Sequence, residues 1–159
     1  MKIKGKDLSS LSKPKTMVIP VEGEDNIVLK YAPILNFSEY DDKYPEPQPP
    51  TVTVPGGGQS VALDDADYLK AQDSWAARKT DWMIWKSLSA DENVEWETVD
   101  PNNPSTFEHV RKELQESVGD GIMNIILTKI IESSNLRSDM IDIATKDFLA
   151  TGAVAPAVS

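Results

Sequence analysis

Residues 64–88 read DDADYLKAQDSWAARKTDWMIWKSL, and this stretch carries the clearest structural signal in the chain. Tyr68, Trp75 and Trp82 recur every seven residues, which is typical of one face of an α-helix. The leading aspartates, at 64 and 65, are both suited to cap the helix, because their side chains accept hydrogen bonds from the first N–H groups. The apolar pattern fades at the end of this stretch. The sequence therefore predicts a long amphipathic helix of about six turns, at roughly 3.6 residues per turn.

Two further helices are predicted directly downstream. Ser105-Thr106-Phe107-Glu108 has the pattern of a capping box, in which serine and glutamate satisfy each other's backbone donors. This second helix is expected to end at Gly119, and a third is expected to begin at Asp120. The third helix is apolar over more than half of its circumference, which predicts a central core helix. Its apolar residues are Ile122, Met123, Ile125, Ile126, Leu127, Ile130 and Ile131.

A fourth helix is predicted before the C-terminus. Gly152 is a natural end for it, because glycine is favoured just beyond the last helical turn. Residues 153–159 are expected to fray. The inward-facing residues are expected to be Met140, Ile141, Ala144, Phe148 and Leu149. The predicted fold is therefore mainly α, with a bundle of about four helices in a domain over 63–152.

The first third of the chain reads differently. Two β-rich segments, at 16–21 and 26–31, are separated by the turn-like Glu22-Gly23-Glu24-Asp25, which predicts a short β-hairpin within a region over 16–43. Two strands alone are marginal in water, so the hairpin must dock or pair. Residues 44–62 are rich in proline and glycine and are predicted to form an extended, flexible linker.

Composition and charge exclude several classes of function. The 159 residues contain no cysteine and one histidine, which excludes disulfides, thiolate metal sites and multi-histidine sites. The net charge is −10, and residues 1–15, a predicted flexible basic arm, carry +4, which leaves −14 on the remainder. An acidic body disfavours nucleic acid as the partner. The chain also lacks an apolar run long enough for a membrane span or a signal peptide.

No residue pattern predicts catalysis, a cofactor or a metal site. His109 lacks a nucleophile motif such as G-x-S-x-G and is expected to be a helix-surface residue. The acidic clusters at 41–42 and 64–67 lack the spacing of a calcium loop. We therefore expect that the protein is not an enzyme.

The tryptophans suggest binding of another protein. The partner-binding candidates are Tyr68, Trp75, Trp82 and Trp85, all on the predicted helix. One interpretation makes this face the core of the bundle, and another lets part of it meet a partner, because tryptophan and tyrosine are favoured in binding hot spots. Both interpretations stay open at this point.

The order of segments over residues 45–150 resembles the tail assembly chaperones of long-tailed bacteriophages. A Pro-rich lead-in and a Trp-rich helix are followed by Val94-Glu95-Trp96-Glu97-Thr98-Val99-Asp100, then by Pro104-Ser105-Thr106-Phe107, and finally by Ile143-Ala144-Thr145-Lys146-Asp147-Phe148-Leu149. Residues 1–44 have no counterpart in this pattern.

The resemblance implies a small helical protein made in the host cell cytoplasm during infection. Such a chaperone binds the phage tape measure protein, keeps it soluble and helps recruit the tail tube protein. A client coated at many positions also favours homo-oligomers of the chaperone. The alternative is a structural virion protein, a tail or head-completion subunit whose hairpin and basic arm lock onto neighbouring subunits. A DNA-mimicking decoy is disfavoured by the basic arm and the tryptophans.

Overall fold

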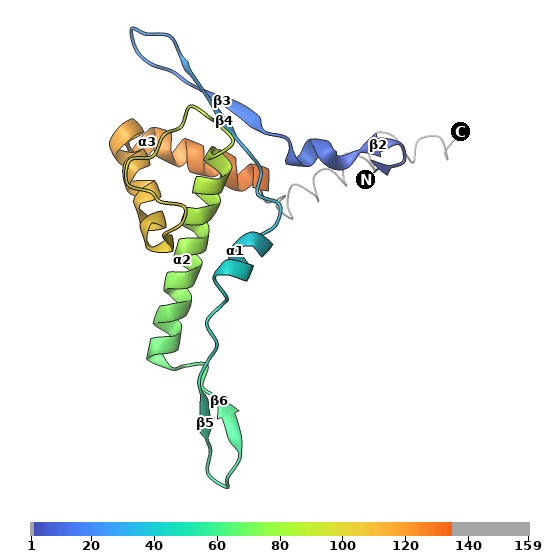
Figure 1. Ribbon diagram of the computed structural model, residues 1–159, viewed down its shortest axis with the longest axis vertical. Coiled ribbons are helices and arrows are strands. Elements are labelled where there is room, and N and C mark those ends of the chain that lie inside the picture. The colour runs from blue at the N-terminus through green and yellow to red at the C-terminus, as the bar shows by residue number, and fades with distance from the viewer. Residues whose placement is uncertain (1, 135–159) are drawn as a thin grey trace, which may run out of the picture.

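The computed structural model describes residues 2–134 and shows a helical body with three projections (Figure 1). The body is formed by the long helices α2 (Ala66–Leu88) and α3 (His109–Ser134), with the short helix α1 (Ser38–Lys43) beside α2. Three two-stranded antiparallel sheets complete the described part of the chain. Their strands are β1 (Lys2–Ile3) with β2 (Lys6–Asp7), β3 (Lys15–Ile19) with β4 (Ile27–Tyr31), and β5 (Thr51–Thr53) with β6 (Gln59–Val61). Short 3-10 helices, η1 (Leu8–Ser12) and η2 (Pro104–Glu108), lie before β3 and α3.

The prediction of a four-helix bundle is wrong. Residues 2–134 contain three α-helices, one of them short, and three small sheets, and they do not form a bundle of four packed helices. The second and third predicted helices are two arms of α3, and α1 packs on α2 through the rings of Tyr40 and Trp82. The predicted fourth helix, with Met140 to Leu149, and the tail over 153–159 lie outside the described residues.

Helix α2 follows the sequence prediction closely. The Asp65 side chain caps it by accepting the N–H of Tyr68 at 2.8 Å, and its last residue is Leu88. The first half of the helix extends away from the body, and its buried residues lie between Asp81 and Leu88. The seven-residue repeat of aromatic residues therefore predicted the helix correctly, while only its C-terminal half is enclosed.

Helix α3 bends at Gly119. This residue has φ 76° and ψ 167°, a backbone conformation that side chains disfavour, so it separates the helix into two arms. The expected helix end at Gly119 is therefore a kink. The expected capping box is replaced by Asn103, whose side chain accepts the N–H of Ser105 at 3.2 Å and starts η2. Regular α-helix begins only at His109.

The predicted N-terminal hairpin is present as β3 and β4. The two strands pair in antiparallel register, with Met17 opposite Leu29 and Val18 opposite Val28. Met17, Ile19, Leu29 and Tyr31 face the body, while the alternate side chains face outward. The hairpin thus docks one apolar face on the helices, as an isolated pair of strands requires.

Residues 51–61 form a second hairpin where a linker was predicted, and this prediction is corrected. Strands β5 and β6 pair around Val54-Pro55-Gly56-Gly57-Gly58. Gly56 (φ 99°) and Gly57 (φ 86°) supply the left-handed backbone of the turn, and Val54 N–H donates to the Gly58 carbonyl at 2.8 Å. The glycines therefore close a turn between β-branched segments. The hairpin projects beyond the start of α2 (Figure 1).

One apolar core joins the N-terminal region to the helices. It combines Ile19, Leu29, Tyr31, Ile34 and Tyr40 with Trp82, Met83, Ile84, Leu88, Val99, Phe107, Val110, Ile126 and Ile130. Backbone contacts tie these parts together: Ala32 N–H donates to the Ser87 carbonyl at 2.9 Å, and the Ser87 hydroxyl donates to the Ala32 carbonyl at 2.7 Å. Residues 16–43 are thus packed into the same body as α2 and α3.

The third helix was predicted to be the central core helix, and it is only partly buried. In the C-terminal arm of α3 only Ile126 and Ile130 are buried among the predicted apolar residues. Ile125 is 57% exposed and Ile131 is 41% exposed. The arm lies across β3 and α2 and packs with one side, so its apolar residues divide between core and surface.

Candidate protein-binding surface

The structure separates the four aromatic residues predicted to bind a partner. Trp82 is only 3% exposed, and its ring packs against Tyr40 at 5.6 Å and Phe37 at 6.1 Å between centroids. Trp85 is half-buried against Phe107 at 5.6 Å. Trp82 is therefore a core residue, and the aromatic stripe is divided between two sides of α2.

Trp75 lies at the edge of the core, on the side of α2 that faces α1. Its indole N–H donates to the Tyr44 carbonyl at 2.7 Å, and its ring lies 5.9 Å from that of Tyr40. The Tyr40 hydroxyl donates to the Trp75 carbonyl at 3.1 Å, and burial raises the pKa of Tyr40 to about 12. Trp75 is thus held firmly while part of its surface stays open. Tyr68 lies almost two turns earlier and is half-buried near the start of the helix.

An apolar groove runs beside Trp75, and we call it the α2 groove. It has a volume of about 290 Å³ and is lined by Phe37, Trp75, Ala76, Lys79, Thr80, Met83 and Ile131. Its lining comes from the segment before α1, from α2 and from α3. Of the four predicted residues, only Trp75 contributes to it. Phe37 and Ile131 were missed because they are distant in sequence, and no local pattern connects them to α2.

Lys79 gives the α2 groove a cationic rim. Its Nζ lies 4.6 Å from the centre of the Trp75 ring and 4.8 Å from that of Phe37, in the range of cation–π contacts. The same Nζ lies 2.7 Å from the Asp41 carboxylate. Lys79 therefore fastens α1 to α2 and covers part of the aromatic floor with its aliphatic stem.

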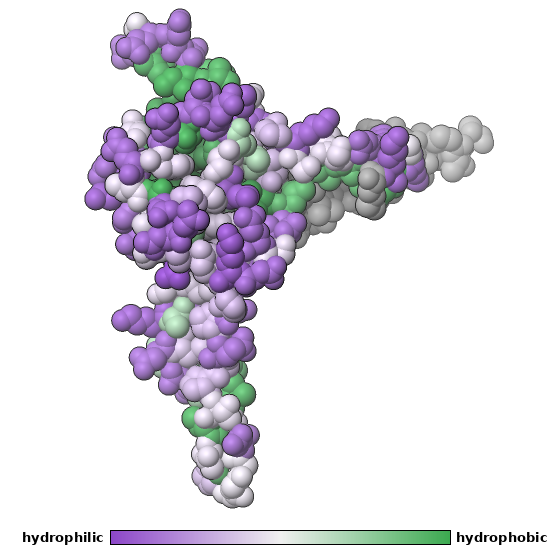
Figure 2. Space-filling model, viewed as in Figure 1, coloured by the Kyte–Doolittle hydropathy of each residue, from purple (hydrophilic) through white to green (hydrophobic). Residues whose placement is uncertain are grey.

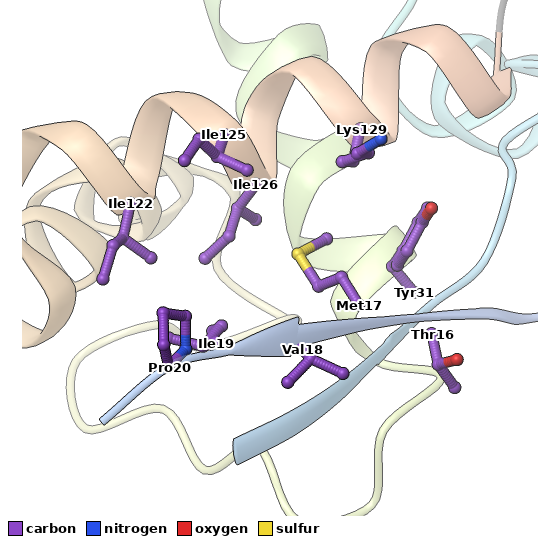
Figure 3. A pocket seen from close by; sticks show the side chains of 10 residues that line it. All are labelled: Thr16, Met17, Val18, Ile19, Pro20, Tyr31, Ile122, Ile125, Ile126 and Lys129. Carbon is purple, nitrogen blue, oxygen red and sulfur yellow. The ribbon is translucent and has the colours of Figure 1, made fainter. Parts of the chain in front are cut away.

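A second apolar groove lies between β3 and α3, and we call it the β3–α3 groove (Figure 3). Its volume is about 300 Å³, and its lining residues are Thr16, Met17, Val18, Ile19, Pro20, Tyr31, Ile122, Ile125, Ile126 and Lys129. Figure 3 shows Ile122 and Ile126 facing Ile19 and Pro20, while Thr16 and Val18 point to the other side of the hairpin. The β3 side of the groove belongs to the hairpin that the structural-protein alternative assigns to contacts with neighbouring subunits, while the α3 side was expected to be core.

Exposed apolar side chains gather on the projecting hairpins. Figure 2 shows hydrophobic surface along the β3–β4 hairpin at the top and the β5–β6 hairpin at the bottom, beside a largely polar body. The exposed residues there include Val18, Ile27, Val28, Val52 and Val61. Exposed apolar surface that is rimmed by polar residues is typical of protein-binding sites.

The histidine serves a structural role. His109 Nδ1 lies 3.2 Å from the Thr98 carbonyl, and the neighbouring Glu113 carboxylate accepts the N–H groups of Glu97 (3.0 Å) and Thr98 (2.6 Å). Burial alone raises the pKa of Glu113, but the hydrogen bonds from Thr98 and Glu97 outweigh burial and lower it. These contacts hold the loop before η2 against α3.

Asp81 is a buried carboxylate, 3% exposed, on the polar side of α2. Burial raises its pKa, and the Arg111 guanidinium, whose Nε lies 2.5 Å from Oδ1, counteracts this effect. The pair ties α2 to α3. Within residues 2–134, no group of three or more histidine, aspartate or glutamate side chains is placed to hold a metal ion. None of the helices in the same range has the length and apolar composition to cross a membrane.

Comparisons of the chain with protein-family models, curated proteins and solved structures found no match.

Proposed function

We propose that this protein is a non-enzymatic tail assembly chaperone of a long-tailed bacteriophage, acting in the cytoplasm of the infected host cell. Its client is the tape measure protein, which it keeps soluble while tail tube subunits are recruited. The α2 groove carries this proposal, because it is an apolar groove with an aromatic floor on the surface of a strongly acidic protein. The order of segments over 45–150 supplies the link to phage tails.

The α2 groove suits the apolar stripe of a client helix. Helices bind such grooves through side chains spaced three and four residues apart. Trp75 and Phe37 offer rigid apolar surface, and Ile131 adds an exposed wall. Because these residues are held by Tyr40, Tyr44 and the helices, the groove needs little rearrangement to accept a helix. The net charge of −10 opposes non-specific association of the chaperone with itself.

The proposal is tested by co-expressing the protein with the tape measure protein of the same phage genome. We expect the tape measure protein to be soluble and to co-purify only when the chaperone is present. Ala76→Glu places a charge in the α2 groove that a bound client must desolvate, so co-purification is expected to be lost. Ala77→Glu is the matched control, because Ala77 is an exposed alanine of the same helix that does not line the groove. Equal loss in both variants would contradict the proposal.

A structural virion protein is a second candidate, favoured by one observation. Three hairpins project from the body, and two-stranded hairpins have edges that strands of neighbouring subunits can extend (Figure 1). Quantitative mass spectrometry of purified particles separates the two candidates. A stoichiometric copy number in mature particles supports the structural protein, and absence from them supports the chaperone.

A further inference from the structure

The hydrogen bonds of the β3–β4 hairpin reveal which way its backbone groups point. Lys30 N–H donates to the Asp91 carboxylate at 2.8 Å and therefore points away from β3. In an antiparallel pair of strands, successive pairs of opposite residues alternate between two types. In one type the backbone N–H and carbonyl groups bond across to the other strand, and in the next they point away from it. Lys30 lies opposite Thr16, so this pair is of the outward type, and Val18 with Val28, two residues along, is of the same type. Thr16 and Val18 thus direct their N–H and carbonyl groups to the outer edge of β3.

The two edges of the hairpin differ. On the β4 side, Asp91 accepts from Lys30, and the Ser87 carbonyl accepts from Ala32 at 2.9 Å, so α2 and its following loop cover that edge. On the β3 side, no residue of the described chain forms a hydrogen bond with the outward groups of Thr16 or Val18. The open edge borders the β3–α3 groove, which has apolar walls from α3 and one charged residue, Lys129. Such an edge beside a helix is a site for strand addition.

Two prolines define the length and symmetry of this edge. Pro14 and Pro20 directly flank β3, one before its first residue and one after its last, and prolines have no N–H to donate. Only Thr16 and Val18 therefore offer outward donors, and Met17 lies at the centre of the series. Rotation by 180° about Met17 in an antiparallel pairing places Thr16 opposite Val18 and Pro14 opposite Pro20. The edge thus complements a copy of itself, which is the requirement for a twofold interface.

We propose that the occupant of this edge is β3 of a second copy of the same chain. The two strands pair antiparallel about a twofold axis at Met17 and join the hairpins into one four-stranded sheet. Thr16 pairs with Val18 of the second copy, and Val18 pairs with its Thr16, each pair exchanging two backbone hydrogen bonds. At both ends a proline lies opposite a proline, so the ladder stops without leaving unpaired donors.

Side chains around the edge support the same arrangement. Val18 is 60% exposed on the outer face, and in the four-stranded sheet it gains Thr16 of the second copy as its opposite neighbour and Val18 of that copy on the diagonal. Lys15 falls opposite Ile19 of the second copy, so the nearest lysines are not brought face to face. A third and fourth strand also raise the stability of a hairpin that is marginal by itself. This proposal does not depend on the identity of the client.

Cysteine cross-linking tests the register, because the chain has no cysteine of its own. In the proposed pairing, Met17 lies directly opposite Met17 of the second copy, at a Cα separation of about 4.5 Å that suits a disulfide. The Met17→Cys variant of the full chain is therefore expected to form a covalent dimer under mild oxidation. Val18→Cys is a more exposed control whose two copies lie diagonally, at a Cα separation of about 9 Å that is too long for a disulfide. Val28→Cys, on the opposite strand, is also expected to stay monomeric on denaturing gels.

Proline substitution tests the edge without disulfide chemistry. Val18→Pro removes an outward N–H of β3, and Val28→Pro removes an outward N–H of β4, while neither removes a hydrogen bond between the two strands. Light scattering after size exclusion is expected to show a dimer for the parent chain and for Val28→Pro, and a monomer for Val18→Pro. Circular dichroism checks that both variants are folded.

Three results would overturn the proposal. The first is a parent chain that stays monomeric at every concentration tested. A strand of another protein bound to β3, in place of a second copy, would count as the same result. The second is faster cross-linking of Val18→Cys than of Met17→Cys. The third is equal dissociation of the two proline variants when both remain folded. If co-expression with the tape measure protein fails while these dimer results hold, only the proposed function is rejected.

Discussion

Asp91 and Lys30 are joined across 61 residues of chain by one hydrogen bond, from the Lys30 N–H to Asp91 Oδ2 at 2.8 Å. The same carboxylate accepts the N–H of Asn93 through Oδ1 at 3.0 Å. Asp91 is only 4% exposed, directly after the end of α2. This contact fastens β4 to the helical body and leaves β3 as the open edge of the hairpin.

Replacing Asp91 with alanine is expected to destabilise the protein by about 1 kcal/mol, because the partly buried hydrogen bonds from the Lys30 and Asn93 N–H groups lose their acceptor. The hydrogen bonds from the N–H groups of Lys30 and Asn93 lower the pKa of Asp91 in the folded state. A lowered folded-state pKa stabilises the protein above the unfolded pKa of about 3.9, and the effect is lost as the pH falls through the folded value. Urea denaturation should therefore show a large difference between parent and variant at pH 7 and a small one near pH 3. An equal difference at both pH values would show that the carboxylate charge is unimportant.

Arg111→Ala is expected to destabilise the protein by about 3 kcal/mol at pH 7, because it leaves the buried Asp81 carboxylate without its partner. Burial raises the pKa of Asp81, so the folded state takes up a proton more readily than the unfolded state. The penalty should therefore shrink as the pH falls from 7 toward the raised pKa of Asp81, because protonation makes the buried carboxyl neutral. Denaturant titrations across this range measure it. Lys112→Ala, an exposed neighbour, should change stability by less than about 0.5 kcal/mol.

Two glycines of α3 should respond to alanine in opposite ways. Gly119 has φ 76° and ψ 167°, so Gly119→Ala should cost about 1–3 kcal/mol through backbone strain. Gly121 has no such φ, and a Cβ there meets no atom within 4 Å. Gly121→Ala should stabilise the helix by about 0.5–1 kcal/mol. Thermal melts followed by circular dichroism compare the two, and stabilisation by Gly119→Ala would contradict the kink.

Adjacent isoleucines separate the core from the surface of α3. Ile126 is 1% exposed, and Ile126→Asp should unfold the protein, because an unpaired charge is buried there. Ile125 is 57% exposed, and Ile125→Asp should leave the fold intact. Circular dichroism and urea titration measure both. Similar behaviour of the two variants would mean that this arm of α3 packs in another orientation.

Trp82→Ala should destabilise the protein by about 3–5 kcal/mol, because it empties a site enclosed by Tyr40 and Phe37. Trp85 is half-buried, and Trp85→Ala should cost clearly less. Urea denaturation monitored by circular dichroism compares them. If the Trp82 variant kept its stability and lost only client binding, the tryptophan would belong to the interface instead of the core.

Much of the local structure could be predicted from the sequence. The aspartates at 64 and 65 and the seven-residue aromatic repeat predicted the extent of α2, and the turn at 22–25 predicted the β3–β4 hairpin. These features depend on backbone preferences and caps within a few residues. The β5–β6 hairpin was missed, because its proline and glycine content is shared by flexible linkers and by tight turns.

The sequence by itself determined where the chain becomes helical or extended, and its lack of cysteine and its acidic charge determined which chemistries were excluded. Only the tertiary structure decided that Trp82 is enclosed while Trp75 lines a groove, and that Ile126 is buried while Ile125 is exposed. It also decided that β3 keeps an open edge, through an aspartate that follows α2. These outcomes depend on α1, η2 and Asp91, segments that contact α2, α3 and β4 across long stretches of chain. The burial of a side chain and the pairing of a strand edge depend on such distant contacts, so the local periodicity of the sequence does not predict them.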